Sequence, residues 1–191
     1  MSSTAAEALE GYRRRGVTSR GRLSEAALVR AARRGSEDAV AELFDRHWDA
    51  AYRTAVLVTG DRAAAEDIAQ EAFLAAVRAL ASFDLRRPLR PWLHRIVVNR
   101  AIDWSRSRAL RAEVGAEVVA EAAAPASAPC FGDDVMAALL GLAPEQRAVV
   151  VLRYVVELTP GEIAKLLGLP RGTVNSRLRR GLDALEGVIE R

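Results

Sequence analysis

Hydrophobic positions recur along most of the chain at the spacing of α-helices. Between Val40 and Ala55, apolar residues follow one another at intervals of three and four over several turns, which predicts a helix with one buried face. Aromatic residues make up only 5% of the chain and β-branched runs are short, so strands are not expected. The pattern predicts an all-α protein.

Three helices are predicted in the first 80 residues. Ser24 can cap a helix that Gly35 ends, and Ser36 opens the next one, whose first turn carries two acids. A third helix is expected from about Ala63 to Leu80. Its buried face should hold Ile68, Ala72, Ala76 and Leu80, and its other face Asp67, Gln70, Glu71 and Leu74.

A loop is predicted from Phe83 to Pro91, because a proline disfavours helix in the residue before it. Pro91 suits the first turn of a fourth helix, expected from Trp92 to about Arg108. His47 and His94 are expected to be structural histidines. The fourth helix should turn Leu93, Ile96, Val97 and Trp104 inward, with Arg95, Arg100, Arg106 and Arg108 at polar positions.

The C-terminal part predicts a helix-turn-helix motif. Two helices, 135–142 and 144–156, precede a capping box that starts at Thr159 and opens a third helix through Leu167. Gly168 supplies a turn, and Pro170 starts a last helix rich in Arg, Ser, Thr and Asn. A helix that lies in the major groove needs such side chains. Val174, Leu178 and Leu182 should face the core.

Charge divides the chain into segments. The net charge of +3 is the balance of +6 over residues 1–111, −5 over 112–134 and +2 over 135–191. The acidic Ala/Pro segment 112–134 is expected to be a flexible linker between two small helical domains, 23–111 and 135–191, after a disordered basic tail, 1–22. All but one of the 28 basic residues are arginine, which binds phosphates and guanines well.

Composition also excludes several classes of protein. One cysteine and two histidines are too few for a Cys/His zinc site, and we expect no metal or other cofactor. No uncharged apolar stretch reaches the roughly 18 residues of a membrane span, and the N-terminus does not resemble a signal peptide. Phosphate-binding loops and nucleophile motifs are missing. The sequence predicts a cytoplasmic, non-enzymatic protein.

Two blocks of sequence resemble one family. The segments LFDRHWDAAYRTAVLVTGDRAAAEDIAQEAFLAAVRALASFD and RPWLHRIVVNRAIDWSR are similar to region 2 of sigma factors of the extracytoplasmic-function group (group 4 of the sigma-70 family). The segment LAPEQRAVVVLRYVVELTPGEIAKLLGLPRGTVNSRLRRGLDALE resembles their region 4. The resemblance implies an alternative sigma factor that binds core RNA polymerase through its clamp and flap regions. Region 2 would melt and read the −10 promoter element, and region 4 would read the −35 element.

The chain departs from the family pattern at Gly181, where relatives usually carry a larger residue. A glycine here would let the helix end fray or allow close packing.

The resemblance also implies functional residues. Core polymerase is expected to contact Asp67, Gln70, Glu71 and Leu74. The −10 element is expected to contact Arg86, Arg87, Arg90, Arg95, Asn99, Arg100 and Arg106, and the −35 element Arg171, Thr173, Asn175, Ser176, Arg177, Arg179 and Arg180.

The family resemblance also implies a regulatory partner, and the C-terminal motif alone allows an alternative function. Many members of the family are held inactive by an anti-sigma factor, so such a partner is expected here. The alternative function is a stand-alone helix-turn-helix transcriptional regulator, which would share the C-terminal motif but would not need the region-2 block.

Overall fold

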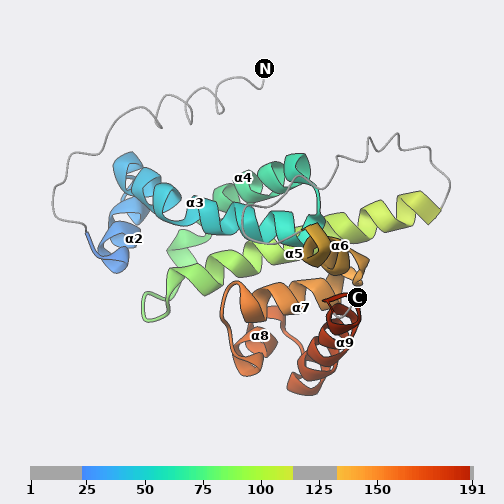
Figure 1. The fold of residues 1–191 in the computed structure, drawn as a ribbon. Coiled ribbons are helices and arrows are strands. Elements are labelled where there is room, and N and C mark those ends of the chain that lie inside the picture. The colour runs from blue at the N-terminus through green and yellow to red at the C-terminus, as the bar shows by residue number, and fades with distance from the viewer. Residues whose placement is uncertain (1–22, 114–132, 190–191) are drawn as a thin grey trace. The chain divides into compact units, whose positions relative to one another are not determined.

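The computed structural model describes residues 23–113 and 133–189. Regular structure in these ranges is helical throughout (Figure 1), which confirms the all-α prediction. The expected tail, 1–22, and most of the expected linker lie outside the described residues. The elements in order are α2 (Glu25–Arg33), α3 (Glu37–Thr59), α4 (Arg62–Ala79), the 3-10 helix η1 (Leu80–Ser82), α5 (Leu89–Glu113), α6 (Asp133–Gly141), α7 (Pro144–Tyr154), α8 (Pro160–Leu167) and α9 (Arg171–Ile189).

Local signals place the first helix boundaries where the sequence predicts them. The Ser24 hydroxyl accepts a hydrogen bond from the Ala27 N–H at 3.2 Å and caps α2. Gly35 follows α2 with a φ of 88°, a left-handed conformation that favours glycine. The Ser36 hydroxyl accepts from the Ala39 N–H at 3.3 Å at the start of α3. Each cap satisfies backbone groups that the helix itself leaves unpaired.

The contacts separate a first unit, which ends at Arg46, from a second, which begins at His47. In the first unit Leu28 and Val29 of α2 are buried. In the second, α4 lies against α5, and Trp48 packs on Phe73 with ring centroids 5.9 Å apart. The predicted inner face of this segment is confirmed, since Ile68, Ala72 and Ala76 of α4 and Leu80 of η1 are all buried.

The expected bounds of the fourth helix were wrong. Helix α5 begins at Leu89 and continues to Glu113, so the loop is three residues shorter than predicted. Pro91 is therefore the third residue of the helix, where its missing N–H costs nothing because the first-turn donors have no partner within the helix. Burial of Leu89 outweighs the bias against helix before a proline. Of the expected inward residues, Ile96 and Trp104 are only half-buried.

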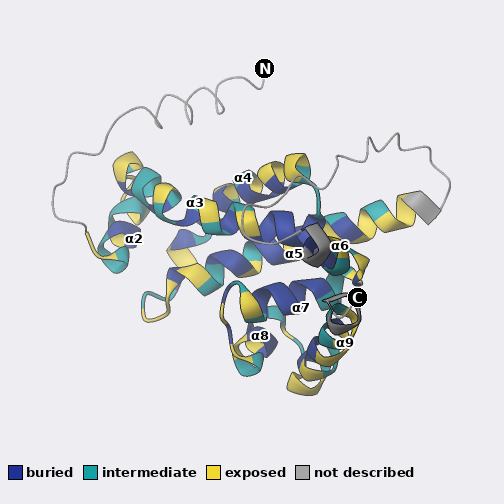
Figure 2. Ribbon diagram, in the orientation of Figure 1, coloured by how far each residue is buried: buried dark blue, intermediate teal, exposed yellow. Residues whose placement is uncertain are grey.

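The C-terminal helices form around α7. Helix α9 lies against α6, α7 and α8, and residues 147–152 of α7 are all buried, as Figure 2 shows. This short helix has almost no solvent-facing side in its middle, so it is the core element on which the helix-turn-helix is built. No helix in the described part of the chain is long and apolar enough to cross a membrane.

Candidate nucleic-acid interface

The helix-turn-helix motif forms as the sequence predicts. The Thr159 hydroxyl accepts from the Glu162 N–H at 3.3 Å, and the Glu162 carboxylate accepts from the Thr159 N–H at 2.8 Å. These two bonds complete the predicted capping box. The Thr159 hydroxyl also donates to the Glu162 carboxylate at 2.6 Å, and this bond, together with the one from the Thr159 N–H, lowers the pKa of Glu162 from its usual value. Gly168 ends α8 in the left-handed conformation, with a φ of 66°, and turns the chain into α9.

Helix α9 has a buried side and a polar side. Val174 and Leu178 are buried, whereas Leu182 is half-buried. Gly181 is also buried, and a Cβ at this position would lie 2.7 Å from the Val150 side chain in α7. Close packing of α9 on α7 therefore explains the glycine.

The polar side of α9 carries the residues expected at the −35 element. Arg179 forms a loose ion pair with Asp183 at 3.9 Å, and the Ser176 hydroxyl donates to the Thr173 carbonyl at 2.9 Å. Arg180, like Arg179, is exposed on this side. Of the full set, Arg171, Asn175, Arg179 and Arg180 are exposed, and Thr173, Ser176 and Arg177 are half-buried.

The loop between η1 and α5 presents two arginines. Phe83 is buried and its ring lies 4.9 Å from that of Trp92. Between this anchor and α5, Arg86 and Arg87 are exposed. Asp84 pairs with both arginines, closely with Arg86 at 3.0 Å and loosely with Arg87 at 3.8 Å.

Three of the five expected −10 contacts on α5 have protein partners. Arg90 donates to the Val155 carbonyl at 3.4 Å. Arg100 lies 3.7 Å from Glu71, and Arg106 pairs with Glu145. The remaining two, Arg95 and Asn99, are exposed and lie one turn apart on one side of the helix.

The outer face of α4 combines acids with apolar side chains. Asp67 and Glu71 are exposed, and Leu74 leaves 57% of its surface to solvent. The Gln70 amide donates to Glu66 at 3.5 Å. Sequence reasoning missed Val77, which is 41% exposed one turn beyond Leu74. Its i+3 spacing from Leu74 was the signal that could have found it.

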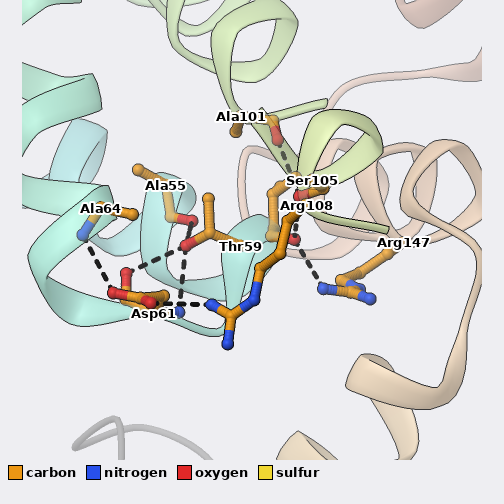
Figure 3. A network of polar contacts seen from close by, with 9 residues as sticks. Ala55, Thr59, Asp61, Ala64, Ala101, Ser105, Arg108 and Arg147 are labelled. Atoms are coloured by element: carbon orange, nitrogen blue, oxygen red, sulfur yellow. Dashed lines mark hydrogen bonds and ion pairs between the residues drawn. The ribbon is translucent and has the colours of Figure 1, made fainter. Parts of the chain in front are cut away.

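A polar network holds the junction of α3, α4 and α5 (Figure 3). Asp61 caps α4 by accepting from the Ala64 N–H at 3.0 Å, and it also accepts from Arg108 of α5 at 2.8 Å. The Thr59 hydroxyl donates to the Ala55 carbonyl at 2.9 Å. Arg108 is therefore a structural arginine that ties α5 to the start of α4.

Arg147 of α7 is a buried arginine, only 7% exposed. It donates to the carbonyls of Val58 at 2.7 Å, Leu140 at 2.9 Å and Leu142 at 3.0 Å. Figure 3 shows its guanidinium beside the α3–α5 network. Burial lowers the pKa of Arg147 from its usual value, and three carbonyl acceptors compensate part of the desolvation cost.

Both histidines are buried, as structural histidines should be. The Nδ1 of His94 lies 3.1 Å from the Thr54 hydroxyl, and that hydroxyl donates to the Ala50 carbonyl. This contact joins α3 to α5 inside the core. Burial, with Arg90 and His47 nearby, lowers the pKa of His94 to about 4.

The comparisons with known proteins agree with this geometry. The family model "Sigma-70 region 2" matches residues 43–111, and "Sigma-70, region 4" matches residues 132–185. The two matches define the class: the chain combines the two conserved parts of a sigma-70-type factor. The first match contains α4 and most of α5, and the second contains α6, α7, α8 and most of α9.

Relatives identify the family more closely. The ECF RNA polymerase sigma factor SigW of Bacillus subtilis is 34% identical over 172 residues, which are 82% of this chain and 92% of SigW. SigL of Mycobacterium tuberculosis is 35% identical over 177 residues, 87% of this chain and 92% of SigL. The chain therefore belongs to the extracytoplasmic-function (ECF) RNA polymerase sigma factors. Members of this family are transcription initiation factors and not enzymes, so this chain is an alternative sigma factor.

Solved structures of related proteins have the same fold. CnrH, solved in complex with the cytosolic domain of CnrY, matches with a TM-score of 0.64 and 29% identity, over 87% of this chain and 97% of CnrH. RpoE of Bartonella quintana, solved with the anti-sigma factor NepR, matches with a TM-score of 0.67 and 23% identity, over 78% of this chain and 95% of RpoE.

Proposed function

We propose that α9 reads the −35 element of promoters. The observation that carries the proposal is the division of α9 into a packed side, with Val174 and Leu178 buried, and an exposed side that holds Asn175, Arg179 and Arg180. Arginine binds guanine edges and phosphates through its planar fork, and asparagine suits adenine. Arg171, Thr173, Ser176 and Arg177 lie on or beside this surface and would add phosphate and base contacts.

The −10 element would be held by the loop 83–88 and by α5. Arg86 and Arg87 are exposed at the loop, and Arg95 and Asn99 are exposed on the helix. These groups suit a melted strand, because arginines attract its backbone while an opened base can be accepted by a loop. To bind DNA, Arg90, Arg100 and Arg106 would exchange their present partners for phosphates.

Core polymerase would dock on the outer face of α4. Leu74 and Val77 are exposed apolar side chains, and Asp67 and Glu71 lie on the same helix with their carboxylates in solvent. An apolar pair beside acids is a surface that a partner protein can cover. Gln70 belongs to this face, which would meet the polymerase clamp, while the residues 135–191 would meet the flap. The two parts that would meet polymerase in this way are domains over residues 23–111 and 135–191.

Transcription with purified core polymerase tests these assignments. The chain should support run-off transcripts from a promoter and bind duplex DNA weakly when alone. Arg179→Ala should reduce transcription from a promoter that needs its −35 element by about tenfold, the order of one lost arginine contact. Glu71→Ala should instead weaken core association and leave DNA contacts intact.

Arg53→Ala is the matched control, because Arg53 is an exposed arginine of α3 that the proposal does not use. If Arg179→Ala and Glu71→Ala reduce core binding and DNA binding equally, the division of roles is wrong. If the chain binds duplex DNA tightly alone and never yields promoter-dependent transcripts, it acts as a stand-alone helix-turn-helix regulator.

We further propose that the chain works in the cytoplasm, where polymerase and DNA are found, under the control of an anti-sigma factor. The relative CnrH was solved with a cytosolic domain of CnrY bound, which supports a protein regulator here. Co-purification of the full chain with the product of a neighbouring gene tests this, and loss of run-off transcription on adding that product is the expected result.

A further inference from the structure

The loop between η1 and α5 is anchored at both ends. Phe83 is buried against Trp92, and Leu89 is buried at the first residue of α5. Between them lie Arg86 and Arg87, whose side chains are 90% and 80% exposed. Because the ends are fixed in the core, the conformation of this short tip depends on contacts within the tip itself.

Asp84 supplies these contacts. Its Oδ1 accepts from both the backbone N–H and the Nε–H of Arg86 at 3.0 Å, and its Oδ2 accepts from an Arg86 terminal nitrogen at 3.1 Å. The Asp84 carbonyl accepts from the Arg87 N–H at 3.0 Å. One aspartate thus closes a turn of the type that favours Asp and binds a guanidinium through two of its nitrogens. Hydrogen bonds from Arg86 also lower the pKa of Asp84.

Arg86 and Arg87 therefore differ in how closely they pair with Asp84. Arg86 has two nitrogens engaged by Asp84, whereas Arg87 only approaches the same carboxylate at 3.8 Å. An ion pair this exposed adds little to stability, so the arrangement matters for what the tip presents to a ligand. Arg87 presents a guanidinium that is only loosely paired, and Arg86 presents one that the carboxylate already binds through two hydrogen bonds.

We propose that Asp84 is a positioning residue that makes the loop selective for the −10 element. By holding Arg86, it fixes the turn and removes one sequence-independent attraction for phosphate from the tip. Contact with the DNA backbone then falls mainly to Arg87, while the shaped loop discriminates among bases. The inference rests on the proposed role of this loop in binding the melted −10 strand.

Asp84→Asn separates the turn from the ion pair. An asparagine Oδ1 can still accept from the Arg86 N–H, but the charge that holds the guanidinium is gone. The probes are a promoter fragment from which the wild-type holoenzyme makes run-off transcripts and the same fragment with its −10 element scrambled. Holoenzyme carrying Asp84→Asn should bind the scrambled fragment severalfold more tightly, so that discrimination falls. The slope of log affinity against log salt should steepen by about 0.7, the value for one added single-strand phosphate contact.

Arginine variants show which side chain is responsible. In the wild type, Arg87→Gln should flatten the salt slope by about 0.7 and Arg86→Gln by clearly less. In the Asp84→Asn background, Arg86→Gln should undo the steepening, since the two residues act through one interaction. Asp84→Ala, which loses the turn as well, should also reduce promoter opening.

Asp49→Asn is the control for net charge, because it removes one exposed carboxylate from α3. The inference is overturned if Asp84→Asn leaves discrimination and salt slope at wild-type values, or if Asp49→Asn changes them equally. The two levels of failure are distinct. If the wild-type chain never yields promoter-dependent transcripts, the proposed function is refuted. If the wild type transcribes normally but Asp84→Asn leaves discrimination and salt slope unchanged, only the role of Asp84 is refuted.

Discussion

Gly181 and Gly172 lie in the same helix and predict opposite effects of one substitution. Replacing a glycine within a helix by alanine normally stabilises by about 1 kcal/mol. At Gly172 an added Cβ meets nothing within 4 Å, so Gly172→Ala should raise the free energy of unfolding by up to that amount. At Gly181 the added Cβ would lie 2.7 Å from the Val150 methyl.

The size of the effect at Gly181 follows from this contact. Carbon atoms pack best at about 3.5–4.0 Å, so α9 or Val150 would have to shift by about 1 Å. Val150 is buried in α7, and overpacking of a core costs about 1–3 kcal/mol. After the gain in helix propensity, Gly181→Ala should destabilise by roughly 0–2 kcal/mol.

Urea denaturation of the full chain, followed by circular dichroism, measures both variants. The expected difference between Gly181→Ala and Gly172→Ala is about 1–3 kcal/mol, or several degrees in Tm for a chain of this size. Val150→Ala in the Gly181→Ala background should recover part of the loss. The reasoning is refuted if Gly181→Ala stabilises the protein as much as Gly172→Ala does.

Three further predictions concern caps and buried polar groups. Thr159→Ala removes the hydroxyl half of the capping box with Glu162 and should lower the free energy of unfolding in urea melts by about 1 kcal/mol. An unchanged free energy of unfolding would show that the capping box does not stabilise the fold. Burial lowers the pKa of His94 to about 4 in the fold, against an ordinary value of 6.5, so the unfolded chain binds more protons between these two pH values. The contribution of His94 to the free energy of unfolding should be fully present above pH 6.5 and should fall by up to about 3 kcal/mol as the pH is lowered towards 4. His94→Gln should abolish that component, and an unchanged pH profile would contradict the assignment. Asp61→Asn keeps an oxygen that can cap α4 but loses the charge that binds Arg108, so it should destabilise less than Asp61→Ala in the same melts; equal losses would mean that the cap contributes nothing.

Local signals were predictable from sequence because each acts within a few residues. The Thr159 capping box, the left-handed Gly168 and the serine cap of α2 are all formed by neighbours along the chain. The start of α5 was mispredicted because the local bias against helix before Pro91 is weaker than the burial of Leu89, and burial depends on the rest of the fold.

The ion-pair partners of the charged side chains could not be predicted either, because they also depend on the rest of the fold. The pairing of Arg106 with Glu145 and of Arg108 with Asp61 joins residues 39 and 47 positions apart, and no periodicity indicates such pairs. The sequence did suggest Arg106 as a −10 contact, yet the structure shows it already engaged. Asp84 lies only two residues from Arg86, but its hydrogen bonds to the Arg86 guanidinium require a particular turn. That turn depends on the two loop ends that are fixed in the core, so the local sequence did not predict it.

On the proposal that α9 reads the −35 element, its two-sided construction has a consequence for how new promoter preferences arise. Its packing is decided by Val174, Leu178 and Gly181, which are buried, while Asn175 and Arg180 lie in solvent and make no contribution to the core. Exchange of solvent-side residues should change the free energy of unfolding by no more than about 0.5 kcal/mol each, so duplicated copies of such a gene could vary them. Divergence of regulons then requires no remodelling of the domain, and the same positions are the ones to randomise when a factor is to be retargeted.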